Sequence, residues 1–330
     1  MELTRRKWLA GAGGLLVGAC GIPEVLATST RPGGVRTLGG PAFGTYWRST
    51  VPRGTDETSV RQAIEATIEA VDQSMSPFRA DSEISRFNAA KTIASVPASG
   101  PFQAVVAESL RIAELSGGAF DPTVGPLVNR HGFGPIRGNA RARFTDITIA
   151  NGSIRKAMPD ATLDLCGLAQ GYALDSIAAA LDKLGVEDFV VELGGEVLAR
   201  GRHPAGRPWR IAIEAPKPAD KAIQRVVRLD GKALATSGDT ANGYAFAGRR
   251  YSHIIGPQRS APVNGRMASV SVIAPSAIEA DALATAVMAL GPGKGAAFAA
   301  RLKVPTLILL RDGTGIRERA VAGFHDYVSI

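Results

Sequence analysis

The segment LDLCGLAQGY, residues 163–172, is a glycine-punctuated turn that opens a helix. Asp164 precedes the turn, and Gly167 and Gly171 allow a ligand or another part of the backbone to approach closely. Free N–H groups and the positive dipole end of a helix suit an anion such as phosphate. The same residues are equally consistent with Asp164 acting only as an N-cap beside packing glycines. The segment alone therefore leaves both interpretations open.

Helices and strands alternate on both sides of this turn. Apolar residues at helical spacing predict helices over residues 56–74, 101–116 and 168–184. Runs rich in Val and Ile predict strands at Phe189–Glu192, Trp209–Ile213, Ala268–Ile273 and Thr306–Leu310. There is neither a strict βαβ order nor a repeat of fixed period. The pattern favours the mixed α/β (α+β) class as one domain with a mixed sheet, and two lobes around a cleft are the alternative arrangement.

Composition excludes several classes of protein. The 330 residues are 45% hydrophobic and 21% charged, which is typical of globular proteins rather than disordered or fibrous ones. The mean hydropathy is +0.06 and no run of 18 apolar residues occurs, so a polytopic membrane protein is excluded. The cysteines, Cys20 and Cys166, are too few for a disulfide framework or a Cys-built zinc site. The net charge of +8 comes from scattered basic residues, which indicates a solvated basic surface rather than a nucleic-acid interface.

The amino terminus has the features of an export signal. Arg5 and Arg6 precede a short, glycine-rich apolar run, Leu9–Ala19, that cannot span a bilayer. Paired arginines before a mild apolar region are typical of a twin-arginine signal peptide. The sequence therefore predicts a periplasmic protein exported by the twin-arginine route.

Two processing sites compete within this signal. A lipobox ends at Cys20, whose lipidation would anchor the protein to a membrane, and ordinary cleavage would follow Ala27. The predicted organisation is a signal peptide at residues 1–27, a linker at 28–38 and one functional domain at 39–330.

A second informative segment covers residues 275–288. Ser276 and Glu279 form a capping-box pattern. Beyond the cap, Asp281 is the only charge on an otherwise apolar helix, and Thr285 lies one turn further on the same face. A buried carboxylate needs a cation or hydrogen-bond donors. Asp281 could pair with a buried Arg or Lys, but oxygen ligands from Asp and Thr suit Mg²⁺, and the metal interpretation is favoured.

A third pair of segments, residues 235–239 and 251–257, combines small hydroxyl residues, a glycine turn and a histidine. Such loops often carry function. A lone histidine is more often structural than catalytic, so His253 by itself receives no role from the pattern.

A series of short motifs appears in one order from about Gly39 to the C-terminus. They are Phe43-Gly44-Thr45, Ser76–Arg79 with Asp81–Asn88, Gly118–Leu127, Asp164–Tyr172, Glu192–Glu196, Thr236–Gly238, Ser252–Ile255, and Glu279–Asp281 with Thr285. In this order the chain resembles the FAD:protein FMN transferases, the ApbE family. The resemblance implies a single ApbE-like domain around a flavin cleft. It also implies an exported, Mg²⁺-dependent enzyme that cleaves FAD, releases AMP and joins FMN to a threonine of a partner protein through a phosphoester.

The resemblance also implies roles for individual residues. Expected flavin contacts are Phe43, Phe78, Ala119, Phe120, Asp121, Asp164, Gln170 and Ile255. Expected metal ligands are Asp281, Thr285 and the carbonyl of Gly167. His253 matches the residue that would help to deprotonate the acceptor threonine. Implied partners are flavin-bearing subunits of respiratory electron-transfer complexes or of nitrous-oxide-reductase maturation.

The chain departs from the family pattern at four positions: Phe43 replaces Met, Gln170 replaces Lys or Glu, Ala284 replaces an extra carboxylate of some relatives, and Gly256 replaces Asp. Two other functions are consistent with the same motifs. One is an exported protein that binds or stores FAD without transferring it, and the other is hydrolysis of FAD to FMN and AMP. The identity of the acceptor is not encoded in these motifs.

Overall fold

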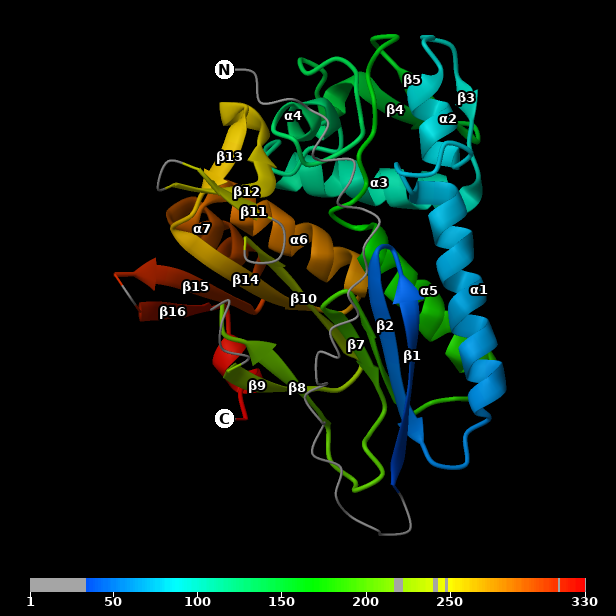
Figure 1. The fold of residues 1–330 in the computed structure, drawn as a ribbon, viewed down its shortest axis with the longest axis vertical. Helices are drawn as coiled ribbons and strands as arrows, with labels where there is room; N and C mark the ends of the chain where they lie inside the picture. Colours follow the sequence, from blue (N-terminus) through cyan, green and yellow to red (C-terminus); the bar gives the residue numbers. More distant parts are fainter. Residues whose placement is uncertain (1–33, 217–221, 240–242, 247–248, 314, 330) are drawn as a thin grey trace.

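The computed structural model describes residues 34–216, 222–239, 243–246, 249–313 and 315–329 (Figure 1). The predicted signal peptide, with Arg5, Arg6 and both processing sites, lies outside the described residues. The predicted linker at 28–38 ends too late, because the first strand already begins at Val35. None of the described helices is long and apolar enough to cross a membrane.

One eight-stranded sheet forms the centre of the fold, in the order β1-β2-β6-β7-β10-β14-β15-β16. Its strands are β1 (Val35–Ala42), β2 (Thr45–Pro52), β6 (Phe189–Leu193), β7 (Glu196–Arg200), β10 (Lys232–Gly238), β14 (Met267–Ala274), β15 (Thr306–Asp312) and β16 (Gly315–Val321). Every pair of neighbouring strands in this sheet is antiparallel. The α+β form of the predicted class is confirmed. The expected mixed sheet is instead antiparallel, since most of its neighbouring strands are joined by hairpins or by connections that return them in the opposite direction.

Three smaller sheets surround it. They contain β3 (Val96–Pro97), β4 (Ile147–Ala150) and β5 (Ser153–Lys156); β8 (Trp209–Glu214) and β9 (Ile223–Leu229); and β11 (Gly243–Phe246), β12 (Arg249–Gly256) and β13 (Ala261–Asn264). The four runs predicted as strands are all strands, in β6, β8, β14 and β15.

The described helices are α1 (Glu57–Met75), α2 (Glu83–Ala89), α3 (Gly100–Leu115), α4 (Gly125–Arg130), α5 (Ala169–Lys183), α6 (Ala277–Leu290) and α7 (Pro292–Leu302), with short 3-10 turns η2 (Phe144–Asp146), η3 (Pro257–Arg259) and η4 (Phe324–Tyr327). The three helices predicted from periodicity are confirmed as α1, α3 and α5. The side chain of Asp56 caps α1 by accepting from the N–H groups of Thr58 and Ser59.

The large sheet is covered on both faces. Helices α6 and α7 lie above it in Figure 1, and β8, β9 and η4 lie below it. Side chains of β15 alternate accordingly: Ile308 and Leu310 join the core under the helices, while Leu307 and Leu309 join the core around Trp209. Because both cores share the same strands, the molecule is built around one sheet rather than as two separate lobes.

Helices α5 and α6 approach each other closely at Gly171. A Cβ atom at this position would lie 2.3 Å from the carbonyl oxygen of Ala277, so only glycine fits. The predicted capping box of Ser276 and Glu279 is wrong: Ser276 makes no side-chain cap bond. Asp175 of α5 caps α6 instead, since its carboxylate accepts from the N–H groups of Ala277 and Ile278 at 2.8 and 2.9 Å. The contact between helices thus replaces a local cap.

Candidate active site

Asp281 lies at the centre of the candidate site, on the side of α6 that packs against α5. Its side chain is buried, and its Oδ2 accepts a hydrogen bond from the backbone N–H of Gly171 at 3.1 Å. Burial raises the pKa of Asp281 to about 7, and the Gly171 bond opposes that shift. No salt bridge to Asp281 occurs among the described residues, so the alternative of a buried Arg or Lys partner finds no support in this part of the chain.

Neutral oxygen donors gather beside Asp281. Thr285 is one turn along α6, and its Oγ1 lies 3.3 Å from Oγ of Ser237 at the end of β10. A Cβ added to Gly167 would lie 3.4 Å from Thr285 Oγ1 and 3.2 Å from the Phe120 ring, so the turn before α5 packs against both residues. The structure therefore brings the three predicted ligands into one neighbourhood.

This neighbourhood fits a hard divalent cation better than a softer metal. Among the described residues, no group of three or more His, Cys, Asp or Glu side chains is arranged around a common metal position. The available donors are instead a carboxylate, a hydroxyl and a backbone carbonyl, all of them oxygens. Mg²⁺ is commonly held by one or two carboxylates and completed by water and substrate phosphates.

The turn before α5 also carries Asp164. Its Oδ1 accepts from the N–H of Cys166 at 3.1 Å. Burial raises the pKa of Asp164, while the Cys166 bond and the positive charge of nearby His253 oppose that shift. Helix α5 itself begins later, at Ala169, without a side-chain cap. Asp164 is thus no helix cap, and the turn brings it close to His253.

His253 lies on β12, which packs against α4 and α6. Its ring meets that of Phe133 edge to face, with 6.4 Å between centroids. Ile255, two residues further along the strand, is buried, and so is Ile254 between them. Gly256 has an ordinary backbone angle, φ −79°, so this departure from the family Asp is not required by the loop conformation.

The segment 119–121 is buried beside the same turn. Asp121 accepts hydrogen bonds from the N–H and hydroxyl of Thr123 at 2.8 and 2.6 Å, and from the N–H of Phe144. Burial raises the pKa of Asp121, and these bonds oppose the shift. The N–H of Asp164 donates to the carbonyl of Pro122 at 2.6 Å, which ties this segment to the turn.

Gln170 and Thr45, which follows the Phe43 turn, both lie against the β6–β7 turn. A Cβ on Gly194, in the β6–β7 turn, would lie 2.9 Å from Gln170 Nε2 and 3.0 Å from Thr45. Phe43 occupies the tight turn between β1 and β2 with a positive φ of 48°, which is unfavourable for a bulky residue. Such strain is found preferentially at ligand sites, so the Phe43 conformation supports its predicted role.

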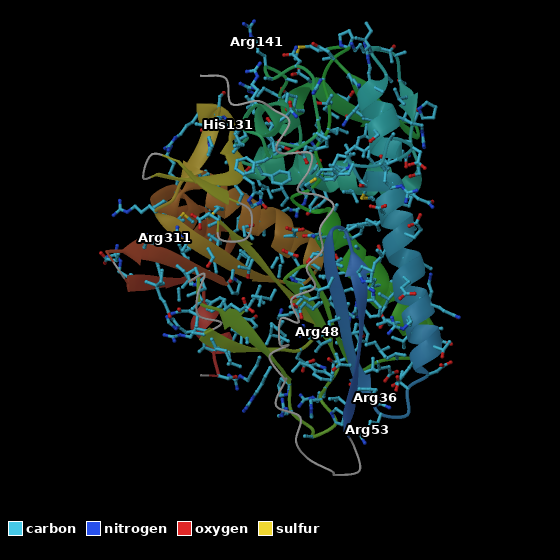
Figure 2. All side chains as sticks on the ribbon, in the orientation of Figure 1. Arg36, Arg48, Arg53, His131, Arg141 and Arg311 are labelled. Atoms are coloured by element: carbon cyan, nitrogen blue, oxygen red, sulfur yellow. The ribbon has the colours of Figure 1, made fainter. Side chains whose placement is uncertain are left out.

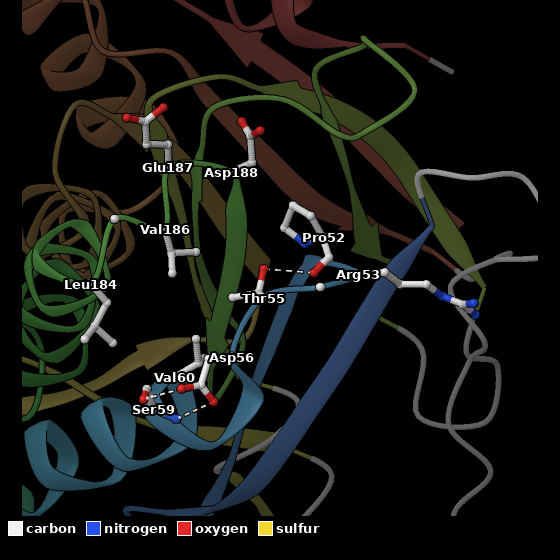
Figure 3. A pocket seen from close by; sticks show the side chains of 12 residues that line it. Pro52, Arg53, Thr55, Asp56, Ser59, Val60, Leu184, Val186, Glu187 and Asp188 are labelled. Carbon is white, nitrogen blue, oxygen red and sulfur yellow. Dashed lines mark hydrogen bonds between the residues drawn. The ribbon is translucent and has the colours of Figure 1, made fainter.

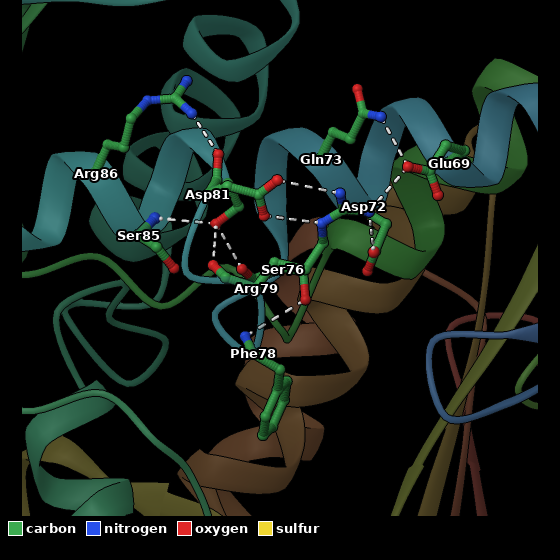
Figure 4. A network of polar contacts seen from close by, with 10 residues as sticks. Glu69, Asp72, Gln73, Ser76, Phe78, Arg79, Asp81, Ser85 and Arg86 are labelled. Atoms are coloured by element: carbon green, nitrogen blue, oxygen red, sulfur yellow. Dashed lines mark hydrogen bonds and ion pairs between the residues drawn. The ribbon is translucent and has the colours of Figure 1, made fainter.

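Phe78 is the one predicted flavin contact that the structure does not bring to the other site residues. Its side chain is 75% exposed, and no described hydrogen bond or ring contact joins it to them. It lies in a loop held by Arg79, which bridges Glu69, Asp72 and Asp81 at 2.9, 3.0 and 3.3 Å. Figure 4 shows the ring pointing away from this polar network. The loop therefore presents an exposed aromatic ring from a fixed backbone.

The end of β10 is fixed by a buried ion pair. Arg311 of β15 (Figure 2) donates from both terminal nitrogens to Asp239, at 2.8 and 2.5 Å, and also to the carbonyl of Gly265 at 2.6 Å. Asp239 is 1% exposed. Asp239 lies two residues after Ser237, so the pair helps to position the strand end that contacts Thr285.

Glu196 is a neighbour that the sequence patterns did not assign. It lies at the start of β7, is 8% exposed, and its Oε2 has no hydrogen-bond partner. Burial raises the pKa of Glu196 well above its usual value, and the charge of Asp281 raises it further. Two glycines, Gly194 and Gly195, precede Glu196 in sequence, and only the three-dimensional fold places it near Asp281.

A separate cavity of about 530 Å³ lies at the N-terminal end of α1, between the β2–α1 turn and the α5–β6 loop (Figure 3). Its walls include Arg53, Asp56 and Glu187 and contain none of the predicted site residues. Volume alone does not indicate chemistry, and the Asp281 neighbourhood remains the candidate site.

The model of the ApbE family matches residues 43–308. The chain belongs to the ApbE family. It is 36% identical to a FAD:protein FMN transferase of Vibrio cholerae over 98% of this chain and 99% of that relative. It is 35% identical to a FAD:protein FMN transferase of Escherichia coli K12 over 86% of each chain.

Solved ApbE structures have the same fold. The flavin transferase ApbE from Vibrio cholerae superposes with a TM-score of 0.79 at 33% identity, covering 89% of this chain and 99% of that one. The apo flavinyl transferase ApbE of Pseudomonas stutzeri gives a TM-score of 0.81 at 34% identity, covering 90% and 97%. These matches span the candidate site as well as the sheet that supports it, so the site lies in the part of the chain that the family shares.

Proposed function

We propose that this member of the ApbE family is an FAD:protein FMN transferase that moves FMN from FAD to a threonine of a partner protein. The observation that carries the proposal is the convergence of Asp164, Asp281 and His253 around one turn. Relatives that match 98% and 86% of this chain are named FAD:protein FMN transferases, which supports the transferase part of the proposal.

The proposed reaction exchanges the phosphoanhydride bond of FAD for a phosphoester bond to threonine. The threonine hydroxyl oxygen attacks the phosphorus of the FMN half of FAD, and the bond from that phosphorus to the bridging oxygen breaks. AMP leaves with the bridging oxygen. His253 accepts the hydroxyl proton and returns a proton to the leaving phosphate. A positioned base of this kind typically contributes a factor of about 10²–10⁴ to the rate.

Gly167, Asp281 and Thr285 would hold Mg²⁺ through a carbonyl, a carboxylate and a hydroxyl. When bound, this ion supplies neutralisation of the pyrophosphate charge. The flavin would be held by the strained Phe43, the exposed ring of Phe78, the 119–121 segment, Asp164, Gln170 and Ile255. Buried Asp121 and half-buried Asp164 supply polar anchors, and the aromatic and apolar side chains supply surface for the ring system.

The test is transfer to an acceptor. The purified chain is incubated with FAD, Mg²⁺ and a flavin-accepting domain of a respiratory electron-transfer or nitrous-oxide-reductase maturation protein. A fluorescent acceptor band on a denaturing gel, and the mass of FMN on a threonine peptide, are expected. Release of FMN and AMP without labelled acceptor would favour FAD hydrolysis, and unchanged FAD would favour storage.

We also propose that the chain acts in the periplasm after twin-arginine export. The proposal is supported by Arg5, Arg6 and the short apolar run that follows them. An Arg5→Lys/Arg6→Lys variant is expected to accumulate as precursor in the cytoplasm. Normal appearance of this variant in the periplasm would contradict the twin-arginine assignment. Mass spectrometry of the mature N-terminus separates lipidation at Cys20 from cleavage after Ala27.

A further inference from the structure

The β6–β7 hairpin places an acidic side chain against the start of α5. Gly194 and Gly195 both have positive φ, 65° and 114°, which glycine adopts without strain and which makes the turn tight. The turn contacts Gln170 so closely that a Cβ on Gly194 would lie 2.9 Å from the Gln170 amide nitrogen. Glu196 follows directly, opposite Leu193 in the hairpin register. Its location is therefore fixed by backbone packing rather than by a flexible side chain.

One oxygen of the buried Glu196 carboxylate lacks a hydrogen-bond donor. The residue is 8% exposed, and the oxygen without a donor is Oε2. No salt bridge to Glu196 or Asp281 is found within the described parts of the chain. Helix α6, which carries Asp281, contacts β7, which carries Glu196. The hairpin also packs on Gln170, next to the Gly171 N–H that donates to Asp281. Two like charges in a buried place are costly unless a proton or a cation lies between them.

The surroundings favour a cation over a proton. Thr285 contributes a hydroxyl to the same neighbourhood, and the Gly167 turn packs against Thr285. Two carboxylates would balance the charge of one divalent ion, and the neutral oxygens would complete the ligand set that Mg²⁺ prefers. A shared proton would use only the carboxylates and would leave the convergence of these other oxygens unexplained.

We propose that Glu196 is a further donor of the metal site, so that β7 and α6 each supply one carboxylate to the same divalent ion. This inference rests on the proposed function, because it assumes that Asp281 binds Mg²⁺. It adds a ligand from a different element, and it assigns a role to the orphaned oxygen of Glu196.

Metal affinity tests the proposal without any measure of transfer. Free Mn²⁺ is titrated into the full-length chain and followed by its electron paramagnetic resonance signal, first without FAD and then with saturating FAD. The variants are Glu196→Gln, Asp281→Asn and Glu192→Gln. Glu192 is the matched control, because it lies on the same hairpin and its charge also reaches Glu196, yet its carboxylate bonds Tyr46 at 2.6 Å. Glu192→Gln therefore reports any general effect of removing one negative charge.

Glu196→Gln is expected to weaken Mn²⁺ binding at least about 10-fold relative to Glu192→Gln. Its melting temperature without metal is expected to be unchanged or higher, because one of two like buried charges is gone. The stabilisation that saturating Mg²⁺ gives to the wild type should shrink in the variant. If Glu196→Gln does not fold, Glu196→Asp serves instead, since a side chain shorter by one methylene should also lose affinity.

The outcomes separate the two proposals. Wild-type affinity in Glu196→Gln, or in Glu196→Asp if that variant is needed, together with lost binding in Asp281→Asn, overturns the role of Glu196 and leaves the proposed metal site intact. A wild-type chain that binds Mn²⁺ neither alone nor with FAD overturns both. Equal losses in Glu196→Gln and Glu192→Gln would also overturn the proposal, because they would reduce the effect to general electrostatics.

Discussion

His253 is partly exposed to solvent and is also held by a ring contact, and both properties suit a group that transfers a proton. It is only partly buried, its ring contacts Phe133, and its charge acts on Asp164. Imidazole is the side chain whose ordinary pKa permits proton transfer in both directions near neutral pH. The same placement would allow His253 to reach an acceptor hydroxyl without carrying the flavin itself.

We therefore expect His253→Ala to lower the rate of transfer by about 10²–10⁴ while FAD affinity stays near the wild-type value. FAD titration and the gel transfer assay measure the two effects separately. His131→Ala is the control, since the His131 side chain contacts only the Ser260 carbonyl, at 3.3 Å, among the described side-chain hydrogen bonds. Joint loss of FAD binding and thermal stability in His253→Ala would mean that the histidine serves packing alone.

Sequence patterns predicted some site residues and not others, and the difference has a physical reason. Asp281 is visible because a lone charge on an apolar helix is anomalous along the chain itself. Glu196 is not anomalous locally, because an acidic residue after two glycines is ordinary in a turn. Only the packing of the hairpin against α5 makes it a buried carboxylate. Features that depend on contacts between distant segments leave little local signal.

For helices and strands, the weak local signal of long-range contacts also explains why the cap of α6 was predicted wrongly. The periodicity of α1, α3 and α5 is a local property, and those helices were predictable to within about a residue or two. The cap of α6 comes from Asp175 on another helix, whereas Glu279, the expected capping partner, bonds Arg111 at 3.1 Å. A motif that permits a local cap does not require one when a neighbouring helix supplies a better placed carboxylate.

The Arg311–Asp239 pair supports the strand end beside the site through a buried carboxylate. Arg311→Ala removes a two-nitrogen partner from a buried carboxylate, so it should lower the free energy of unfolding by about 3–5 kcal/mol. Urea unfolding measures this loss. Arg317→Ala on β16 is the matched control: its pair with Asp312 is exposed and 3.9 Å long. That variant should stay within about 0.5 kcal/mol of wild type. Similar losses in both variants would show that burial of the Arg311 pair is not the cause.

A buried lysine ties β5 to the end of α2. Lys156 donates to the carbonyl oxygens of Phe87 and Ala90 at 2.7 and 2.8 Å, and its ammonium lies 4.5 Å from the Phe87 ring centroid. Burial lowers the pKa of Lys156 to about 8, and the charge of Asp160 opposes this shift. The ammonium group satisfies carbonyl oxygens at the end of α2, but burial makes its positive charge unfavourable.

This pKa gives a pH dependence with a definite sign. Between pH 8 and 10.5 the unfolded chain holds the Lys156 proton more tightly than the folded chain, so folding stability rises with pH in this window. Relative to Lys156→Met, the wild type should gain up to about 1.4 kcal/mol per pH unit there, and the difference should be constant below pH 7. Urea unfolding at a series of pH values measures it. A pH-independent difference would contradict the lowered pKa.

At the scale of the whole molecule, one sheet joins two cores. Trp47 on β2 belongs to the core under the helices, and Trp209 on β8 belongs to the core on the other face. Strands β7, β10, β14 and β15 contribute alternate side chains to both cores. Neither core can lose its packing without exposing the opposite face of the same strands. The two sides of the sheet are therefore expected to unfold together, as a single domain does.

Single-tryptophan variants test this coupling, because each remaining tryptophan reports one core. In a Trp8→Phe background, Trp209→Phe leaves Trp47 as the fluorophore and Trp47→Phe leaves Trp209. Each substitution shifts the midpoint itself, so tryptophan fluorescence and far-ultraviolet circular dichroism are compared within each variant. We expect the two probes to coincide in both proteins, since the shared strands transmit loss of packing from one face to the other. If the Trp209 signal changed at a lower urea concentration than the circular dichroism of the same variant, the β8–β9 side would be an independently unfolding unit, and the single-domain organisation would fail.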